Sequence, residues 1–253
     1  MGPALWLGIV QGLTEFLPVS SSGHLVVLRH LLGVTGAGAA WEVALHLGTL
    51  GALLLGLRHR LGTWGRRLVR RDPRARRLVA LLALGTLPAA VVGGIGGDVL
   101  AHWLFRPSVA AFGFAATAVA LWTTPAPGRG WRSLEDLDPR DALAVGAAQA
   151  LALIPGFSRS GATMAAARWC GLAPDAAAEL SFLLAIPVTA GAVLLEAPAI
   201  VTLGPPALIG AAAALGAGLV ALGAAFRALA APRWWRPLGL YTMMMAVWTW
   251  TLR

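Results

Sequence analysis

Residues 11–25 read QGLTEFLPVSSSGHL, an apolar segment interrupted by a proline and a run of serines. Proline stops a helix because it lacks an amide hydrogen, and the serine–glycine run leaves backbone groups without helical partners. At membrane depth such groups are tolerated only where neighbouring protein or a polar cavity satisfies them. The wider apolar stretch 4–32 therefore predicts a re-entrant helix pair that is broken at Pro18.

A second apolar stretch, 141–171, is broken in the same way, by Pro155 and the run GFSRSG. Shifting the first stretch by 138 positions without a gap brings six residues into identity, among them two serines at the break and a glutamine before it. The pairs are Gly8/Gly146, Gln11/Gln149, Leu13/Leu151, Ser20/Ser158, Ser22/Ser160 and Gly23/Gly161. This identity predicts an internal duplication within one membrane domain, residues 1–253, with repeat one at approximately 1–124 and repeat two at approximately 141–253.

The whole chain has the composition of a membrane protein. Of its 253 residues, 58% are hydrophobic and 12% are charged, and the mean hydropathy is +0.73. A soluble domain carries roughly 25% charged residues. A membrane span needs about 20 apolar residues, and the candidates are 41–57, 78–97, 108–124, 176–195, 207–226 and 237–252. We therefore expect an all-α integral membrane protein with about six transmembrane helices and two re-entrant helix pairs.

The charge distribution predicts the orientation in the membrane. The net charge of +9 comes from 20 arginines, with no lysine, against 11 acidic residues. Nine of the arginines lie in the loop 58–77 beside one acid, Asp72, so this loop is expected in the cytoplasm. Counting spans outward then places 125–140 and 227–236 inside, and 196–206 and both termini outside. The two broken stretches enter from opposite sides, which is an inverted-topology repeat with the breaks meeting near the midplane.

Composition also excludes several classes of protein. The arginines occupy short gaps between apolar runs, as juxtamembrane charges do, so nucleic-acid binding is not expected. The single cysteine, Cys170, excludes an intramolecular disulfide, and without a Cys/His cluster no structural zinc site is expected. The N-terminal segment lacks a basic region, so we expect it to belong to the mature protein instead of forming a signal peptide.

Two polar residues precede the first break. Gln11 and Glu15 are four residues apart, so on a helix they share one face. An ionisable group inside an apolar segment costs several kcal/mol, roughly, by insertion scales, so Glu15 is expected to face a polar cavity and to have a partner. The structural alternative is a protonated glutamate that ties two helices together.

The residues after the first break suit an anion. Ser20, Ser21 and Ser22 supply hydroxyl and free amide groups at the start of a new helix, and Gly23 allows close backbone approach. His24 is a candidate to accept a proton or to attack phosphorus. The alternatives are an ordinary serine N-cap without a ligand and a histidine that only packs and hydrogen-bonds.

The second break places a cation among hydroxyl groups. Arg159 lies between Ser158 and Ser160, and Thr163 follows one turn later. A guanidinium in such a setting suits a phosphate, which it binds bidentately with charge assistance. The alternative is an internal salt bridge from Arg159 to Glu15.

Three segments together resemble the bacterial undecaprenyl-diphosphate phosphatase family, the bacitracin-resistance phosphatases. They are QGLTEFLPVSSSGHL at 11–25, WEVALHLGT at 41–49 and PGFSRSGAT at 155–163. The resemblance covers essentially the whole chain. It implies hydrolysis of undecaprenyl diphosphate, a C55 isoprenoid diphosphate, to the monophosphate and inorganic phosphate. That reaction recycles the lipid carrier of peptidoglycan synthesis and confers bacitracin resistance, and it implies a bacterial plasma-membrane protein.

Two positions bear on how closely the chain follows the family pattern. The pattern allows Glu or Gln at the position of Gln11 and keeps an acid at Glu15, whereas the usual Gln of the third motif is replaced here by His46. If two acids hold a divalent metal, Gln11 weakens that site, because an amide oxygen is a poorer ligand than a carboxylate. Glu42 and His46 form a further i, i+4 pair and are weaker candidates for supporting positions.

For a phosphatase we therefore assign candidate roles to the residues at the two breaks. The catalytic candidates are Glu15, Ser21, His24 and Arg159, and the substrate-binding candidates are Gln11, Ser20, Ser22, Ser158, Ser160 and Thr163. Glu15 acts as a general base or, with Gln11, binds Mg²⁺ or Ca²⁺. The nucleophile is open between water, His24 and Ser21.

The lipid substrate is expected to enter from the bilayer and to react at a site facing the outer side. The main alternative function is a transporter or flippase of an anionic polyprenyl lipid, because inverted repeats with broken helices are also a transporter design. A structural membrane subunit without a site leaves Glu15 and Arg159 unexplained.

Overall fold

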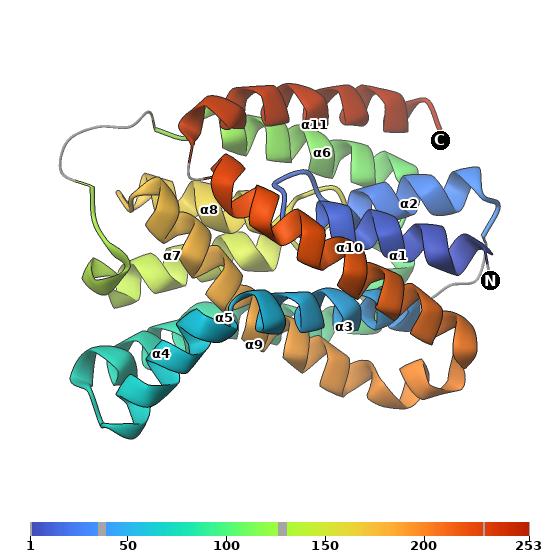
Figure 1. The fold of residues 1–253 in the computed structure, drawn as a ribbon. Helices are drawn as coiled ribbons and strands as arrows, with labels where there is room; N and C mark the ends of the chain where they lie inside the picture. Colours follow the sequence, from blue (N-terminus) through green and yellow to red (C-terminus); the bar gives the residue numbers. More distant parts are fainter. Residues whose placement is uncertain (1, 35–38, 126–130, 230, 253) are drawn as a thin grey trace.

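The computed structural model describes residues 2–34, 39–125, 131–229 and 231–252, and these form a bundle of helices (Figure 1). No β-strand occurs in those ranges, and Arg132 and Leu172 form an isolated bridge. The expected all-α membrane fold is confirmed.

The six predicted spans are all helical. They correspond to α3 (Ala39–Gly56), α5 (Pro73–Leu104), α6 (Pro107–Trp122), α9 (Pro174–Thr202), α10 (Pro205–Leu229) and α11 (Trp235–Trp250). Within the described ranges, α5, α9 and α10 are each long and apolar enough to cross a membrane alone. Helix α3 reaches that standard only together with α4 (Arg58–Val69), across a bend of 70°. Helices α6 and α11 have 16 residues each, which is short for a span.

Both broken stretches form helix pairs, as predicted. They are α1 (Gly2–Thr14) with α2 (Ser21–Leu31), and α7 (Pro139–Leu151) with α8 (Arg159–Trp169). The second helix of each pair begins at a serine cap: Gly23 N–H donates to Ser20 Oγ at 3.2 Å, and Gly161 N–H donates to Ser158 Oγ at 3.1 Å. The two breaks are thus built in the same way.

A buried threonine satisfies the backbone at the second break. Thr117 Oγ1, in α6, donates to the carbonyl oxygen of Gly156 at 2.8 Å and accepts from Ser158 N–H at 2.9 Å. Gly156 has φ +85°, and a Cβ there would overlap the backbone of Ala110. Side-chain hydrogen bonds from a neighbouring helix are what permits irregular backbone at membrane depth.

Substituting Thr117→Val is therefore expected to destabilise the protein strongly. The side chain keeps its shape, but one buried N–H and one buried carbonyl lose their partner, at about 1–3 kcal/mol each. We expect the midpoint of thermal unfolding in detergent to fall by about 5 °C or more. Thr123→Val is the matched control, because its exposed hydroxyl bonds only to carbonyls of its own helix. Equal midpoints for the two variants would contradict this role of Thr117.

Helices from one half of the chain pack against helices from the other half. Helix α1 packs on α10 and α7 packs on α5, while α3 meets α9 and α6 meets α11. Gly8 lies against Gly210 and Gly146 lies against Gly85, so closely that a Cβ at Gly8 or Gly146 would overlap a backbone oxygen. This pairing has the symmetry expected of two inverted repeats; the duplication and its boundaries stay a prediction.

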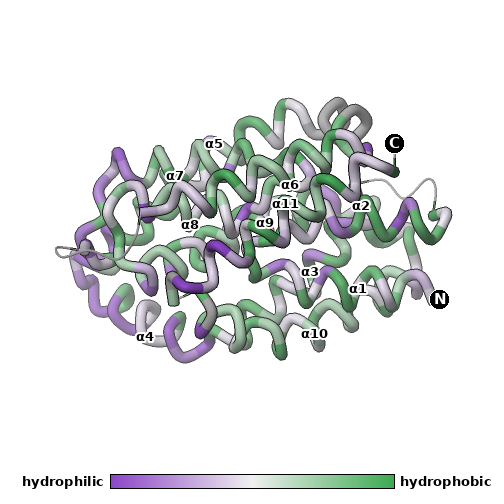
Figure 2. Tube along the Cα trace, turned by 90° about the horizontal axis from the view of Figure 1, so that it is seen from above, coloured by the Kyte–Doolittle hydropathy of each residue, from purple (hydrophilic) through white to green (hydrophobic). Residues whose placement is uncertain are grey.

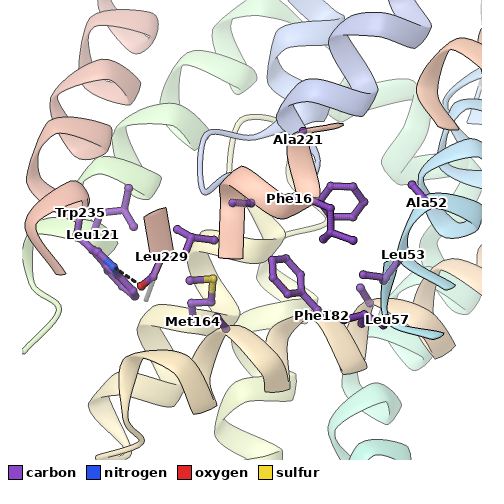
Figure 3. Packing of buried hydrophobic residues seen from close by; sticks show 14 residues of the cluster. Phe16, Ala52, Leu53, Leu57, Leu121, Met164, Phe182, Ala221, Leu229 and Trp235 are labelled. Atoms are coloured by element: carbon purple, nitrogen blue, oxygen red, sulfur yellow. Dashed lines mark hydrogen bonds between the residues drawn. The ribbon is translucent and has the colours of Figure 1, made fainter. Parts of the chain in front are cut away.

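The largest apolar cluster anchors the first break. Phe16, next to the break, packs edge-to-face on Phe182 of α9 with ring centroids 5.9 Å apart (Figure 3). Phe182 in turn packs on Phe226 of α10. Met164 of α8 belongs to the same cluster. Because burying an aromatic side chain stabilises by roughly 1.5–3 kcal/mol, this contact holds the break in place.

The segment 58–77 differs from the expected loop, because it forms α4 and the first turn of α5. Charge counting missed the periodicity of Leu61, Trp64 and Leu68, which lie three and four residues apart and so share one face of a helix. Ion pairs from Arg67 and Arg74 to Glu135 bring this segment beside the short helix at Leu134–Asp136. Hydrophilic residues gather at this end of the bundle, and both termini lie at the opposite end (Figure 2).

Candidate active site

The two breaks meet at one cavity of about 220 Å³. Ser160 Oγ donates to the carbonyl oxygen of Leu17 at 2.9 Å and so joins the breaks directly. The polar lining from the two breaks consists of Glu15, Ser20, Ser21, Ser22, Ser158 and Arg159. The two breaks thus contribute six of the candidate residues to one cavity; their roles stay a prediction.

Glu15 is the centre of the polar network. Ser21 Oγ donates to Glu15 Oε2 at 2.5 Å, and Gln11 Nε2 donates to the same oxygen at 2.9 Å. The guanidinium of Arg159 pairs with the other oxygen, Oε1, and His46 Nε2 lies 3.6 Å from Oε2. The Arg159–Glu15 salt bridge is therefore present, between two residues that also line the cavity. A buried carboxylate is stable only when paired and hydrogen-bonded in this manner.

Ser21 and Arg159 owe their positions to the helix starts. Each is the first residue of its helix, where amide groups have no helical partner and the helix dipole favours a negative charge. Ser20, before α2, has φ +64°, a conformation that costs a non-glycine residue of the order of 1–3 kcal/mol. The contact between the Ser21 hydroxyl and Glu15 has the form of a nucleophile beside its base.

Three predicted residues lie behind the cavity instead of lining it. Gln11 donates a hydrogen bond to Glu15, and Ser160 donates one to the carbonyl oxygen of Leu17 at the first break. Thr163 Oγ1 lies 2.7 Å from Ser181 Oγ of α9. All three are at most 2% exposed. Their geometry is that of supports for the residues that reach the cavity.

His24 is turned away from the cavity. Its Nδ1 lies 2.7 Å from the carbonyl oxygen of Ser20, and its Nε2 lies 2.6 Å from the hydroxyl of Tyr241. The ring stacks on Tyr241 and meets the edge of Phe114, so α11 and α6 fix its direction. The structure does not bring His24 together with Glu15, and this geometry supports the packing alternative over attack on phosphorus.

Residues given less weight in the sequence analysis also line the cavity. Glu42 and His46 of α3 do so, and Glu42 pairs with Arg29 at 3.4 Å. Gln149 and Thr189 contribute from α7 and α9. The alignment of the two repeats places Gln149 opposite Gln11, a signal that pointed to it; Thr189 had no comparable signal.

The rest of the cavity lining is apolar. This apolar wall comes from α3, α5, α9, the residue after α5 and the second break, and consists of Val43, Ala89, Phe105, Ala152, Leu153, Phe157, Val188 and Ala192. A lining with both polar and apolar residues suits an amphiphilic ligand with an anionic head.

The residues present fit a divalent cation only with help from a ligand. Among the described residues, no three His, Cys, Asp or Glu side chains converge to hold a metal. Gln11 Oε1 is buried and has no hydrogen-bond partner in the described structure, and it adjoins Glu15. Mg²⁺ usually takes one or two carboxylates and completes its shell with waters and phosphate oxygens. Glu15 and Gln11 can supply oxygens to such an ion once a phosphate is bound.

Comparison with known proteins identifies the family of this chain. A family model described as bacitracin resistance protein BacA matches residues 4–248. The chain belongs to the BacA family. The match includes both breaks and every residue that lines the cavity. Together with the apolar helices, membership in the BacA family identifies a multi-pass membrane protein.

Curated relatives carry the name undecaprenyl-diphosphatase. One from Thermomicrobium roseum is 44% identical over 215 residues, which cover 79% of this chain and 77% of the relative. Another from Alcanivorax borkumensis is 43% identical over 198 residues, covering 76% and 75%. A third from Desulfosudis oleivorans is 40% identical over 205 residues, covering 76% and 75%. The BacA-family resemblance stated from the motifs is therefore confirmed.

Proposed function

We propose that this protein hydrolyses undecaprenyl diphosphate to undecaprenyl phosphate and inorganic phosphate, which recycles the lipid carrier for peptidoglycan synthesis and confers bacitracin resistance. The observation that carries the proposal is the Ser21 hydroxyl donating to Glu15 beside Arg159, at the meeting point of two helix starts. The substrate is inferred from the BacA-family relatives, which are named undecaprenyl-diphosphatase.

The reaction begins with an exchange of partners at Arg159. The terminal phosphate takes the guanidinium from Glu15 and contacts the amide groups at the starts of α2 and α8. Glu15 is then free to accept the proton of the Ser21 hydroxyl or of a water. The oxygen attacks the terminal phosphorus, the phosphoanhydride bond breaks, and undecaprenyl phosphate leaves. If Ser21 attacks, water releases phosphate from the phosphoserine in a second step.

A divalent cation, Mg²⁺ or Ca²⁺, belongs to the proposal. It would be held by Glu15, Gln11 and phosphate oxygens, and it would neutralise charge on the diphosphate. Glu15 and Gln11 would orient it, while Arg159 keeps its own contact with the phosphate.

We further propose that the site faces the outer side of the plasma membrane and that both termini lie outside. The support is the arginine-rich end of the bundle, which the positive-inside rule places in the cytoplasm, opposite the termini. The isoprenoid chain lies along the apolar wall and reaches the bilayer from there.

Phosphate release by the purified protein in detergent tests the proposal. Wild type should release phosphate from undecaprenyl diphosphate without any ion gradient, and EDTA should lower the rate until Mg²⁺ or Ca²⁺ is restored. If EDTA does not change the rate of phosphate release, the protein is a hydrolase that needs no divalent cation. No release from well-folded protein would favour the alternative, a transporter or flippase of an anionic polyprenyl lipid.

The apolar wall predicts a chain-length effect at Ala192. This residue of α9 lines the cavity, as do Val188, one helical turn earlier, and Ala89 of α5. Ala192→Trp should fill the space beside the first isoprene units and lower kcat/KM for the C55 substrate about tenfold or more, because overpacking costs roughly 1–3 kcal/mol. Hydrolysis of a short, water-soluble diphosphate should change less than about twofold by the same measure.

The adjoining Gly191 offers a matched control, because a Cβ there meets open space. Gly191→Trp should leave both substrates near the wild-type rate. If Ala192→Trp lowers kcat/KM equally for the short and the C55 substrates, Ala192 supports the structure of the site and does not contact the isoprenoid chain.

A further inference from the structure

The polar end of the bundle carries more arginine than its acids neutralise. Each acid in the segments 58–77 and 131–141 is engaged. Asp72 pairs with Arg67, Glu135 with Arg67 and Arg74, Asp138 and Asp141 with Arg132, and Asp136 accepts from Ser133. The hydrogen bond from Arg67 lowers the pKa of Asp72, so that carboxylate is charged at neutral pH and already occupied. Arg60 is likewise paired, with Glu179.

Six arginines of the segment 58–77 keep their charge uncompensated. All six are exposed and none makes an ion pair with another described residue: Arg58, Arg66, Arg70, Arg71, Arg76 and Arg77. Arg58 and Arg66 bond only to groups of their own neighbourhood, the Leu55 carbonyl and the Thr63 hydroxyl. The segment 58–77 therefore presents a cationic surface, because the acids of 58–77 and 131–141 are already engaged with other groups.

The position of α4 directs this surface toward the membrane. The helix bends by 70° from the axis of α3, so it does not continue the span outward into water. Leu61 packs against the apolar core, whereas Leu68 and Val69 are 42% and 85% exposed. A short amphipathic helix with exposed arginines and with exposed apolar residues near its end is typical of a segment that lies in the headgroup layer.

We propose that α4 and the start of α5 form a docking surface for the headgroups of anionic phospholipids. The occupant is a lipid because the surface adjoins the ends of the membrane spans α3 and α5, where headgroups lie. Arginine near an anionic membrane surface raises binding by about fivefold for each residue. The surface lies apart from the cavity and shares none of its lining residues.

The test compares two triple variants with the same change of charge. Arg58→Gln/Arg66→Gln/Arg71→Gln removes three charges from the surface. Arg140→Gln/Arg227→Gln/Arg236→Gln removes three exposed charges that lie outside this surface, in the segments 125–140 and 227–236, which are also predicted to be cytoplasmic. Each protein is exchanged into nanodiscs that mix phosphatidylglycerol with phosphatidylcholine, and the lipids retained after return to detergent are quantified by mass spectrometry.

Wild type and the control triple are expected to retain phosphatidylglycerol preferentially, and the surface triple should lose that preference by about tenfold or more. Equal loss in both triples would overturn the proposal, because the effect would then follow net charge and not this surface. An unchanged preference in the surface triple would overturn it as well. Circular dichroism and phosphate release in detergent confirm that the variants are folded; a surface triple that is unfolded is replaced by the single variants Arg58→Gln and Arg71→Gln, judged by the same criterion.

Discussion

Arg159→Ala is expected to lower kcat/KM for undecaprenyl diphosphate by about a thousandfold or more. Among the described residues, Arg159 is the only arginine that lines the cavity, and it stands at the start of α8 with its guanidinium toward Glu15. Without it, charge that develops on the phosphate in the transition state loses its bidentate partner. The rate of phosphate release as a function of substrate concentration measures the effect.

Two companion measurements separate this role from a merely structural one. Arg159→Lys keeps the positive charge but loses the paired N–H donors of the guanidinium group. Its kcat/KM should therefore lie between those of Arg159→Ala and wild type. Added guanidinium ion should restore part of the activity of Arg159→Ala by filling the space left by the side chain. A folded alanine variant with more than about a tenth of wild-type kcat/KM would refute the assignment, because the loss would then be too small for a transition-state contact.

Ser21→Ala is expected to have the second large effect, a loss of about a thousandfold in kcat. The Ser21 hydroxyl donates to Glu15 at 2.5 Å and lines the cavity, so it is placed both to lose its proton and to reach phosphorus. Ser22→Ala is the control, because Ser22 also lines the cavity while its hydroxyl contacts only Ser20, at 3.2 Å. The control should lose about tenfold at most.

Acid quenching during turnover distinguishes the two chemical routes. A covalent route leaves phosphate on Ser21, which appears in the mass of the peptide that contains it. If Ser21→Ala keeps activity within about tenfold of wild type and no phosphopeptide is found, Glu15 activates water directly. In that case Ser21 only orients the carboxylate.

Local sequence was sufficient to locate the helices and their breaks. The six apolar runs and the two interrupted stretches appear as helices in the expected order, since apolar length, proline and serine caps act within a few residues of chain. The segment 58–77 was the exception, because its amphipathic period was masked by its charge. In that segment the spacing of Leu61 and Trp64 indicates a helix, and a count of arginines does not take this spacing into account.

Function could be inferred from motifs, but the active geometry could not. The sequence by itself determined an all-helical membrane protein with two similar breaks and a set of polar residues at each, because these follow from local hydrophobicity and backbone chemistry. Only the tertiary structure decided that Glu15 and Arg159, 144 residues apart, share one salt bridge. It also decided that Glu42 and His46 reach the cavity while His24 turns toward Tyr241. The physical reason is that the direction of a side chain depends on which distant helix packs beside it, and that packing is settled by close contacts such as Gly8 against Gly210, which no local pattern specifies.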